Sequence, residues 1–295
     1  MSTLTLIFNQ IINGLQSGSI YALVALGYSM VYGIILLLNF AHGDIIMVGT
    51  YVVWGSMVTF HLHPAISVVL AVVACAMMGM TIEKVAYTPL RSAPRLSLLI
   101  TAIGISFLLE NGFQLLFGAG SQKVDLTMGS PLSLGAVSIS FPAMLTIVVS
   151  VICMVALTFL VQKTKLGKAM RAVSEDMGAA QLMGISLNKT ISFTFAIGSA
   201  LAGVASVLYL YTYNGMTDPV MGSMLGLKAF VAAVLGGIGS IPGAMVGGFA
   251  IGLAEALVSA VGLSTWRDGV VFAILIVVLL VKPTGILGRP VTEKV

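Results

Sequence analysis

Hydrophobic residues in this chain form long uninterrupted runs, and the charged residues fall between them. A bilayer-spanning helix needs about 20 mostly apolar residues, and each of five runs without Lys, Arg, Asp or Glu is longer than that. These runs lie between Met1 and Asp44, Asp44 and Glu83, Asp125 and Lys163, Lys189 and Asp218, and Lys228 and Glu255. The shorter apolar runs Leu96–Phe117 and Gly269–Val281 add further candidates. The pattern predicts eight or nine membrane spans.

Composition supports a chain whose main solvent is lipid. Charged residues make up 8% of the 295 residues, whereas a soluble globular domain has about 25%. Hydrophobic residues reach 58% and the mean hydropathy is +1.09, which excludes an ordinary soluble enzyme and a disordered chain. We therefore predict an all-α integral membrane protein, a polytopic helical bundle with broken or re-entrant helices.

Most of the positive charges lie in three segments, which the positive-inside bias assigns to the cytoplasm, the C-terminus included. They are Lys84, Arg91 and Arg95 in the first, Lys163, Lys165, Lys168, Arg171 and Lys189 in the second, and Lys282, Arg289 and Lys294 in the third. The net charge of +4 thus reflects membrane topology, and we expect no nucleic-acid partner.

Two places interrupt the helical pattern at expected membrane depth. One is the segment Asn39–Asp44, which contains the polar residues Asn39, His42 and Asp44. The other is Leu235–Gly248, whose helix-breaking residues are Gly236, Gly237, Gly239, Pro242 and Gly243. Irregular backbone within a membrane is tolerated only where protein or a water-filled cavity surrounds it, so both breaks suggest a translocation pathway. Close helix packing through glycine is the alternative for the second segment, and a simple cytoplasmic turn is the alternative for the first.

Two carboxylates fall inside apolar runs. Glu110, followed by Asn111, and Glu255 would each cost at least about 2.5 kcal/mol at the bilayer centre unless they face the bundle interior or water. We expect them in the pathway, or alternatively as hydrogen-bonded links between helices. Lys228, Arg267 and Asp268 lie near expected span ends, where the side chains can reach the headgroups.

Catalytic motifs are missing from the sequence. His61 and His63 have no metal-ligand partner at helical spacing, so we predict no metal site. There is no Walker A sequence for ATP, and no serine nucleophile motif. We predict that the chain is not an enzyme and binds no cofactor itself.

The segment Gln162–Lys189 is the largest expected cytoplasmic loop. Its composition predicts one helix over Lys168–Met183, with Gly184 as the stop signal. The helix could lie on the membrane surface. Alternatively, its acidic pair and small residues suit docking into a groove of another protein. The residues concerned are Glu175, Asp176, Gly178, Ala179, Ala180 and Gly184.

Four segments of the chain carry a resemblance to a known family. In chain order they are LNFAHGDIIMVGTY (38–51), GKAMRAVSEDMGAAQLMGI (167–185), LGGIGSIPGAMVGG (235–248) and VLLVKPTGILG (278–288). Within the second, Gly178-Ala179-Ala180-x-x-x-Gly184 resembles the Glu-Ala-Ala-x-x-x-Gly loop of bacterial ABC importer permeases, with glycine in place of glutamate. Together the four segments resemble the LivH-type permeases of branched-chain amino acid ABC importers.

This resemblance implies one permease domain over residues 1–295 in the bacterial inner membrane. It implies a LivM-type second permease, two cytoplasmic ATPase subunits that use ATP and Mg, and an external amino-acid-binding protein. Leucine, isoleucine and valine would be the substrates, and residues 162–189 the ATPase-coupling loop. Because Gly178 replaces the glutamate, any carboxylate contact there would have to come from Glu175 or Asp176.

Three alternatives remain open at this stage. A related ABC permease for urea, short amides or other amino acids would share the glycine breaks and the coupling loop. A passive channel would need no docking loop. A non-transporting scaffold would need no polar groups in mid-span, which Glu110 and Glu255 argue against.

Overall fold

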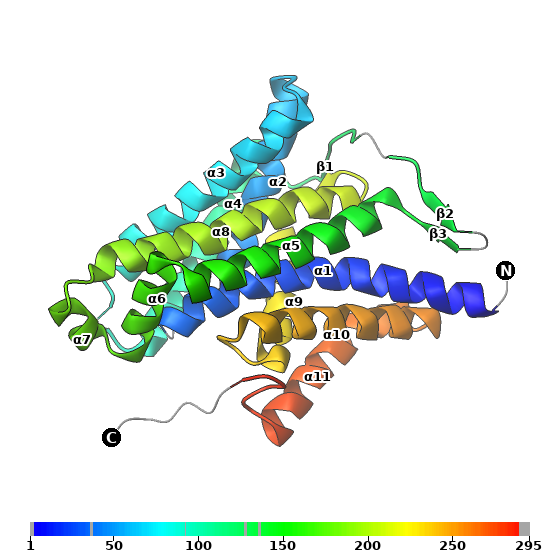
Figure 1. Ribbon diagram of the computed structural model, residues 1–295. Helices are drawn as coiled ribbons and strands as arrows, with labels where there is room; N and C mark the ends of the chain where they lie inside the picture. Colours follow the sequence, from blue (N-terminus) through cyan, green and yellow to red (C-terminus); the bar gives the residue numbers. More distant parts are fainter. Residues whose placement is uncertain (1–2, 36–37, 92, 127–128, 135–136, 289–295) are drawn as a thin grey trace.

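The computed structural model describes residues 3–35, 38–91, 93–126, 129–134 and 137–288, whose long helices lie side by side (Figure 1). Arg289 and Lys294 of the predicted basic tail lie outside these residues. The α-helices are α1 Thr3–Ile35, α2 His42–Trp54, α3 Pro64–Ile82, α4 Arg95–Phe117, α5 Phe141–Lys163, α6 Lys165–Glu175, α7 Met177–Leu182, α8 Leu187–Thr212, α9 Met221–Gly236, α10 Ile241–Ala260 and α11 Arg267–Val281.

Short elements extend or connect these helices. The π-helical turns η1 (Gly55–Thr59) and η2 (Glu83–Tyr87) continue α2 and α3, and a 3-10 turn η3 (Ser264–Trp266) precedes α11. Strand β1 (Gln122–Lys123) pairs antiparallel with β4 (Met216–Thr217), and β2 (Leu132–Leu134) pairs antiparallel with β3 (Val137–Ile139). The long helices and these short connections together confirm the predicted all-α helical bundle.

Seven helical segments within the described chain are long and apolar enough to cross a membrane. They lie in α1, α3, α4, α5, α8, α10 and α11. Helix α9 is a shorter apolar helix beside these seven, so the predicted eight or nine spans match the structure only approximately. The sequence left open whether the region before Asn39 crosses once or twice. The structure shows one continuous helix there, α1, which is about 50 Å long at 1.5 Å per residue.

Helix α1 runs through the middle of the bundle and packs most extensively against α10, and also against α8, α5 and α9. We call the end of the bundle with α6 and α7 the α7 end, and the end with the start of α1 and the strands β2 and β3 the hairpin end (Figure 1). Three helical elements bring predicted cytoplasmic charges to the α7 end: η2 carries Lys84, the last turn of α5 carries Lys163, and the first turn of α8 carries Lys189.

The glycine-rich break between α9 and α10 lies at the α7 end of α1 rather than in mid-span. Gly237 and Gly239 both have positive φ, and a Cβ atom added to Gly33, near the end of α1, would lie 3.3 Å from Gly239 Cα. The segment after α11 covers this turn, because the Ile286 and Leu287 amides donate to the last carbonyls of α9 at 2.9 Å. The helical pattern is broken at this segment, as predicted, and its glycines allow a compact turn and close packing.

The contact between α1 and α10 depends on glycine. A Cβ atom added to Gly252 would overlap the backbone of Gly14 and Gly18, and one added to Gly18 would lie 2.8 Å from the Gly248 carbonyl oxygen. Small residues allow such close approach in membranes, where helix association relies on packing.

We expect Gly252→Ala to lower the free energy of unfolding by about 1–3 kcal/mol, because the added methyl group overpacks this interface. Gly104→Ala is the matched control, since Gly104 lies on α4 with open space around it and alanine favours helices. Thermal unfolding in detergent measures both variants. Equal stability of the two would contradict the packing shown here.

Candidate functional site

Helix α7 and the turns on either side of it form the most distinctive surface at the α7 end. The structure divides the predicted single helix Lys168–Met183 into two, α6 and α7, so that expectation is wrong at Asp176. Asp176 has extended backbone (φ −156°, ψ 110°), and its carboxylate accepts a hydrogen bond from the Ala179 amide at 2.9 Å. Because Asp176 caps α7 in this way, it starts a new helix instead of continuing α6.

The end of α7 matches the sequence prediction. Gly184 has a φ of +82°, and the Ile185 amide donates to the Ala180 carbonyl, a typical helix stop. Ala180 is buried against the bundle, whereas Glu175, Gly178 and Ala179 are exposed. The six residues predicted for coupling therefore lie together around α7.

Two large apolar side chains at the tip of α7 point away from the bundle. Leu182 is 90% exposed and Met183 is 83% exposed. A docked protein that buries them would gain roughly 1.5–3 kcal/mol per side chain. We call Leu182, Met183 and the exposed face of α7 the α7 surface.

A second group of polar residues surrounds the start of α2, which we call the α2 cluster (Tyr28, His42, Asp44, Glu110 and Ser223). Asp44 is fully buried in the first turn of α2, and neither carboxylate oxygen has a hydrogen-bond partner in the described part of the chain. Ser106 and Glu110 of α4 lie near the Asp44 carboxylate. Ser223 of α9 donates a hydrogen bond to Glu110. The predicted pathway residues Asp44 and Glu110 thus lie in one cluster.

His42 and Tyr28 complete the α2 cluster. Their rings pack edge to face with centroids 5.1 Å apart. Neither His42 Nε2 nor the Tyr28 hydroxyl has a partner among the described residues, although both are buried. Buried polar groups are normally satisfied by protein or ordered water, and several without a protein partner lie together in this cluster.

The side chains of the other predicted pathway residues make their hydrogen bonds outside this cluster. Asn39 is buried and accepts a hydrogen bond from the Tyr87 hydroxyl at 3.2 Å, which connects the start of α2 to the end of α3. Asn111 is exposed on α4 and donates to the Phe107 carbonyl of its own helix at 2.8 Å. Neighbours in sequence therefore differ, because Glu110 faces inward and Asn111 faces outward.

The third group, the α10 cluster, consists of Tyr21, Lys228, Glu255 and Asp268. The Glu255 carboxylate accepts a hydrogen bond from the Tyr21 hydroxyl at 2.7 Å and pairs with Lys228 Nζ at 2.8 Å. Lys228 Nζ also lies 2.6 Å from Asp268 and 5.9 Å from the centre of the Tyr21 ring. The cluster joins α1, α9, α10 and α11.

The α10 cluster corrects one expectation. The sequence favoured Lys228 extending to the headgroups, but its side chain is only 16% exposed and is held between two carboxylates. A buried Glu255 needs such a cation, because an unpaired charge in a low-dielectric interior is costly.

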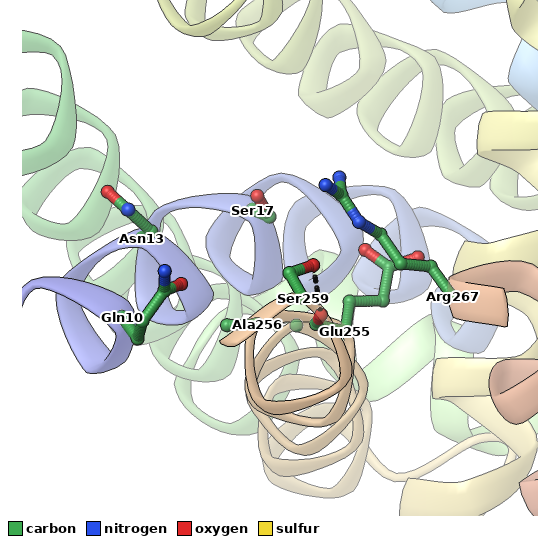
Figure 2. Close-up of a pocket in the computed structure, with 8 residues that line it drawn as sticks. Gln10, Asn13, Ser17, Glu255, Ala256, Ser259 and Arg267 are labelled. Atoms are coloured by element: carbon green, nitrogen blue, oxygen red, sulfur yellow. Dashed lines mark hydrogen bonds between the residues drawn. The ribbon is translucent and has the colours of Figure 1, made fainter. Parts of the chain in front are cut away.

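A pocket opens beside the α10 cluster (Figure 2). Its volume is about 230 Å³, and Gln10, Asn13 and Ser17 of α1 face Glu255, Ser259 and Arg267 across it. The three α1 residues are spaced three and four apart, which places them on one face of the helix. This pocket was not predicted as a unit, although the polar spacing in α1 was visible in the sequence.

One buried carboxylate escaped the sequence analysis. Glu83 is fully buried at the α7 end, where Arg91 Nη2 pairs with it at 2.5 Å and the Ser192 hydroxyl donates to it at 2.5 Å. Glu83 ends an apolar run next to Lys84, so it resembled an ordinary loop charge. It joins α3 to the start of α8, close to α7.

Within the residues that the structure describes, no three His, Cys, Asp or Glu side chains are grouped as metal ligands would be. The candidate site consists of the α2 cluster, the α10 cluster with the pocket beside it, and the exposed α7 surface.

The chain was compared with known proteins. The family described as "Branched-chain amino acid transport system / permease component" matches residues 10–280. The high-affinity branched-chain amino acid transport system permease protein LivH of Escherichia coli K12 is 45% identical, and BraD of Pseudomonas aeruginosa, which has the same description, is 44% identical. Each alignment covers 97% of both chains.

A more distant relative is a probable branched-chain amino acid transport permease protein LivH of Methanocaldococcus jannaschii. It is 31% identical over 92% of this chain and 89% of its own. No solved structure matches the chain.

Proposed function

Because the chain belongs to the branched-chain amino acid transport permease family, we propose that it is the membrane permease subunit of an ATP-driven importer of leucine, isoleucine and valine. The main support is the similarity to LivH and BraD over 97% of the chain, which leaves no room for another domain in either relative. The buried polar clusters supply what a zwitterion needs to cross an apolar bundle.

The energy for uphill transport has to come from other subunits, since this sequence contains no nucleotide-binding motif. We propose that two ATPase subunits, which use ATP and Mg, dock on the α7 surface. The exposed apolar tip formed by Leu182 and Met183 supports this, as does the rigid turn at Gly184. When the ATPases close, α7 would move with them, and the bundle would change between inward-open and outward-open states.

The orientation follows from the positive charges. The α7 end carries most of the basic loop residues and would face the cytoplasm of the bacterial cell, together with the C-terminus. The hairpin end would then face outward, where an external amino-acid-binding protein delivers the substrate. A LivM-type second permease would complete the pathway in the inner membrane.

Uptake in cells tests this proposal. The chain, expressed with its neighbouring transport genes in a strain without its own branched-chain permeases, should restore ATP-dependent uptake of labelled leucine. Unlabelled isoleucine and valine should compete, and urea should not. Uptake of urea or another amide without leucine uptake would support a permease but contradict branched-chain amino acids as its substrates. Leucine uptake that continues after ATP depletion would instead indicate a passive channel.

A further inference from the structure

The pocket beside the α10 cluster is polar, although it opens on the surface of the longest membrane helix. Gln10, Asn13 and Ser17 lie on the candidate span Leu6–Ile34 and face the pocket (Figure 2). Lipid cannot satisfy amide and hydroxyl groups, so this face has to meet water or protein. The polar lining of the pocket therefore argues against a lipid-facing surface at this place.

Its charges are arranged in an unusual way. Arg267 lines the pocket and has no ion-pair partner in the described part of the chain, and the Glu255 side chain lies beside it on the same side of the pocket (Figure 2). Lys228 neutralises Glu255 at 2.8 Å but lies even closer to Asp268, at 2.6 Å. Lys228 can therefore stay paired with Asp268 when another cation approaches Glu255.

We propose that this pocket is a binding site for the zwitterionic head group of the transported amino acid, with its carboxylate on Arg267 and its ammonium group on Glu255. This inference rests on the proposed function and names one binding site within it. A guanidinium suits a carboxylate because it offers two parallel N–H donors. The amides of Gln10 and Asn13 and the hydroxyl of Ser17 satisfy the remaining polar atoms.

The size and position of the pocket fit a small solute. Its volume of about 230 Å³ is below the roughly 300–1,000 Å³ of sites for drug-sized ligands. It lies where α10 ends and α11 begins, toward the hairpin end that would receive the amino acid from the binding protein. Gly252 and Ala256 are the small residues of its lining, on the side of α10 that packs closely against α1.

Substitution of Arg267 tests the site in the complete importer. We expect Arg267→Gln to lower leucine uptake at least tenfold per assembled complex, and Arg267→Lys, which keeps the charge but loses the two parallel N–H donors, to recover uptake only in part. Lys123→Gln removes an exposed positive charge in the β1 strand, outside the pocket, and should leave uptake within twofold. Uptake by Arg267→Gln equal to that of the unchanged chain would overturn the inference. No leucine uptake by the unchanged chain would instead reject the proposed function.

Chemical labelling gives a second readout that does not depend on transport. The variant Asn13→Cys, in a chain whose Cys75 and Cys153 are replaced by alanine, should react with a small thiosulfonate reagent in proteoliposomes. Millimolar leucine should slow this reaction at least threefold, whereas 3-methylbutylamine and 4-methylpentanoate, which each lack one charge, should not. Leucine should no longer slow the reaction when the same chain also carries Arg267→Gln.

Two labelling outcomes would overturn the inference. One is a reaction rate that leucine leaves unchanged. The other is a rate that follows the content of anionic lipid and not leucine, which would assign Arg267 to a lipid phosphate group.

Discussion

Leu182→Asp is expected to abolish ATP-dependent uptake while the chain remains in the membrane. Leu182 is 90% exposed, so the substitution changes no packing inside the bundle. In a docked complex the same position would be buried, and a carboxylate there would lose the apolar contact and its own hydration. A loss of about 3 kcal/mol corresponds to a roughly 100-fold weaker association with the ATPase subunits.

Ser186→Asp is the matched control for this experiment. It introduces the same charge in the same loop, but at the N-cap of α8, where a carboxylate is favourable and Ser186 makes no side-chain cap hydrogen bond. Co-purification of the ATPase subunits and leucine uptake are the two measurements. If Leu182→Asp and Ser186→Asp behave alike in both, the α7 surface is not where the ATPases dock.

Lys228→Met is expected to destabilise the chain by about 3–5 kcal/mol, because it leaves Glu255 buried without its cation. Asp268 loses the same partner but is 47% exposed, so water compensates it. The double variant Lys228→Met with Glu255→Gln removes both buried charges and should recover most of the stability. Thermal unfolding in detergent distinguishes the two variants.

The same pair of variants separates stability from transport. The double variant should fold and assemble but take up leucine at least tenfold more slowly, since Glu255 no longer offers a charge to the substrate ammonium group. Equal stability of the single and double variants would contradict a buried ion pair. Normal uptake by the double variant would remove Glu255 from the pathway.

Much of the fold could be predicted from the sequence because each membrane-spanning helix requires a long apolar run. The apolar runs correspond to the long helices, with Glu110 and Glu255 inside two of them, and Gly184 ends α7 as expected. The transport family was also visible in the sequence segments, and the comparisons confirm it. The sequence did not predict the division of the coupling segment, since the Asp176 side chain ends one helix only by capping the next.

The composition of the buried clusters was not predictable in the same way. Tyr21 and Glu255 are 234 residues apart in the chain, and only the packing of α1 on α10 brings them into contact. The sequence around Lys228 does not show whether its side chain extends to the lipid headgroups or pairs with a buried carboxylate. The direction in which Glu110 and Asn111 face depends likewise on how α4 is rotated against α2 and α9.

The central claim is that this chain transports branched-chain amino acids only when ATPase subunits drive it. The most direct measurement purifies the chain with its associated subunits in mild detergent, reconstitutes them in liposomes and follows ATP hydrolysis together with leucine flux. We expect leucine-loaded binding protein to stimulate both ATP hydrolysis and leucine flux above their rates without it. Purification without any ATPase, or leucine flux with no hydrolysis of ATP, would show that the chain is not an ATP-driven permease.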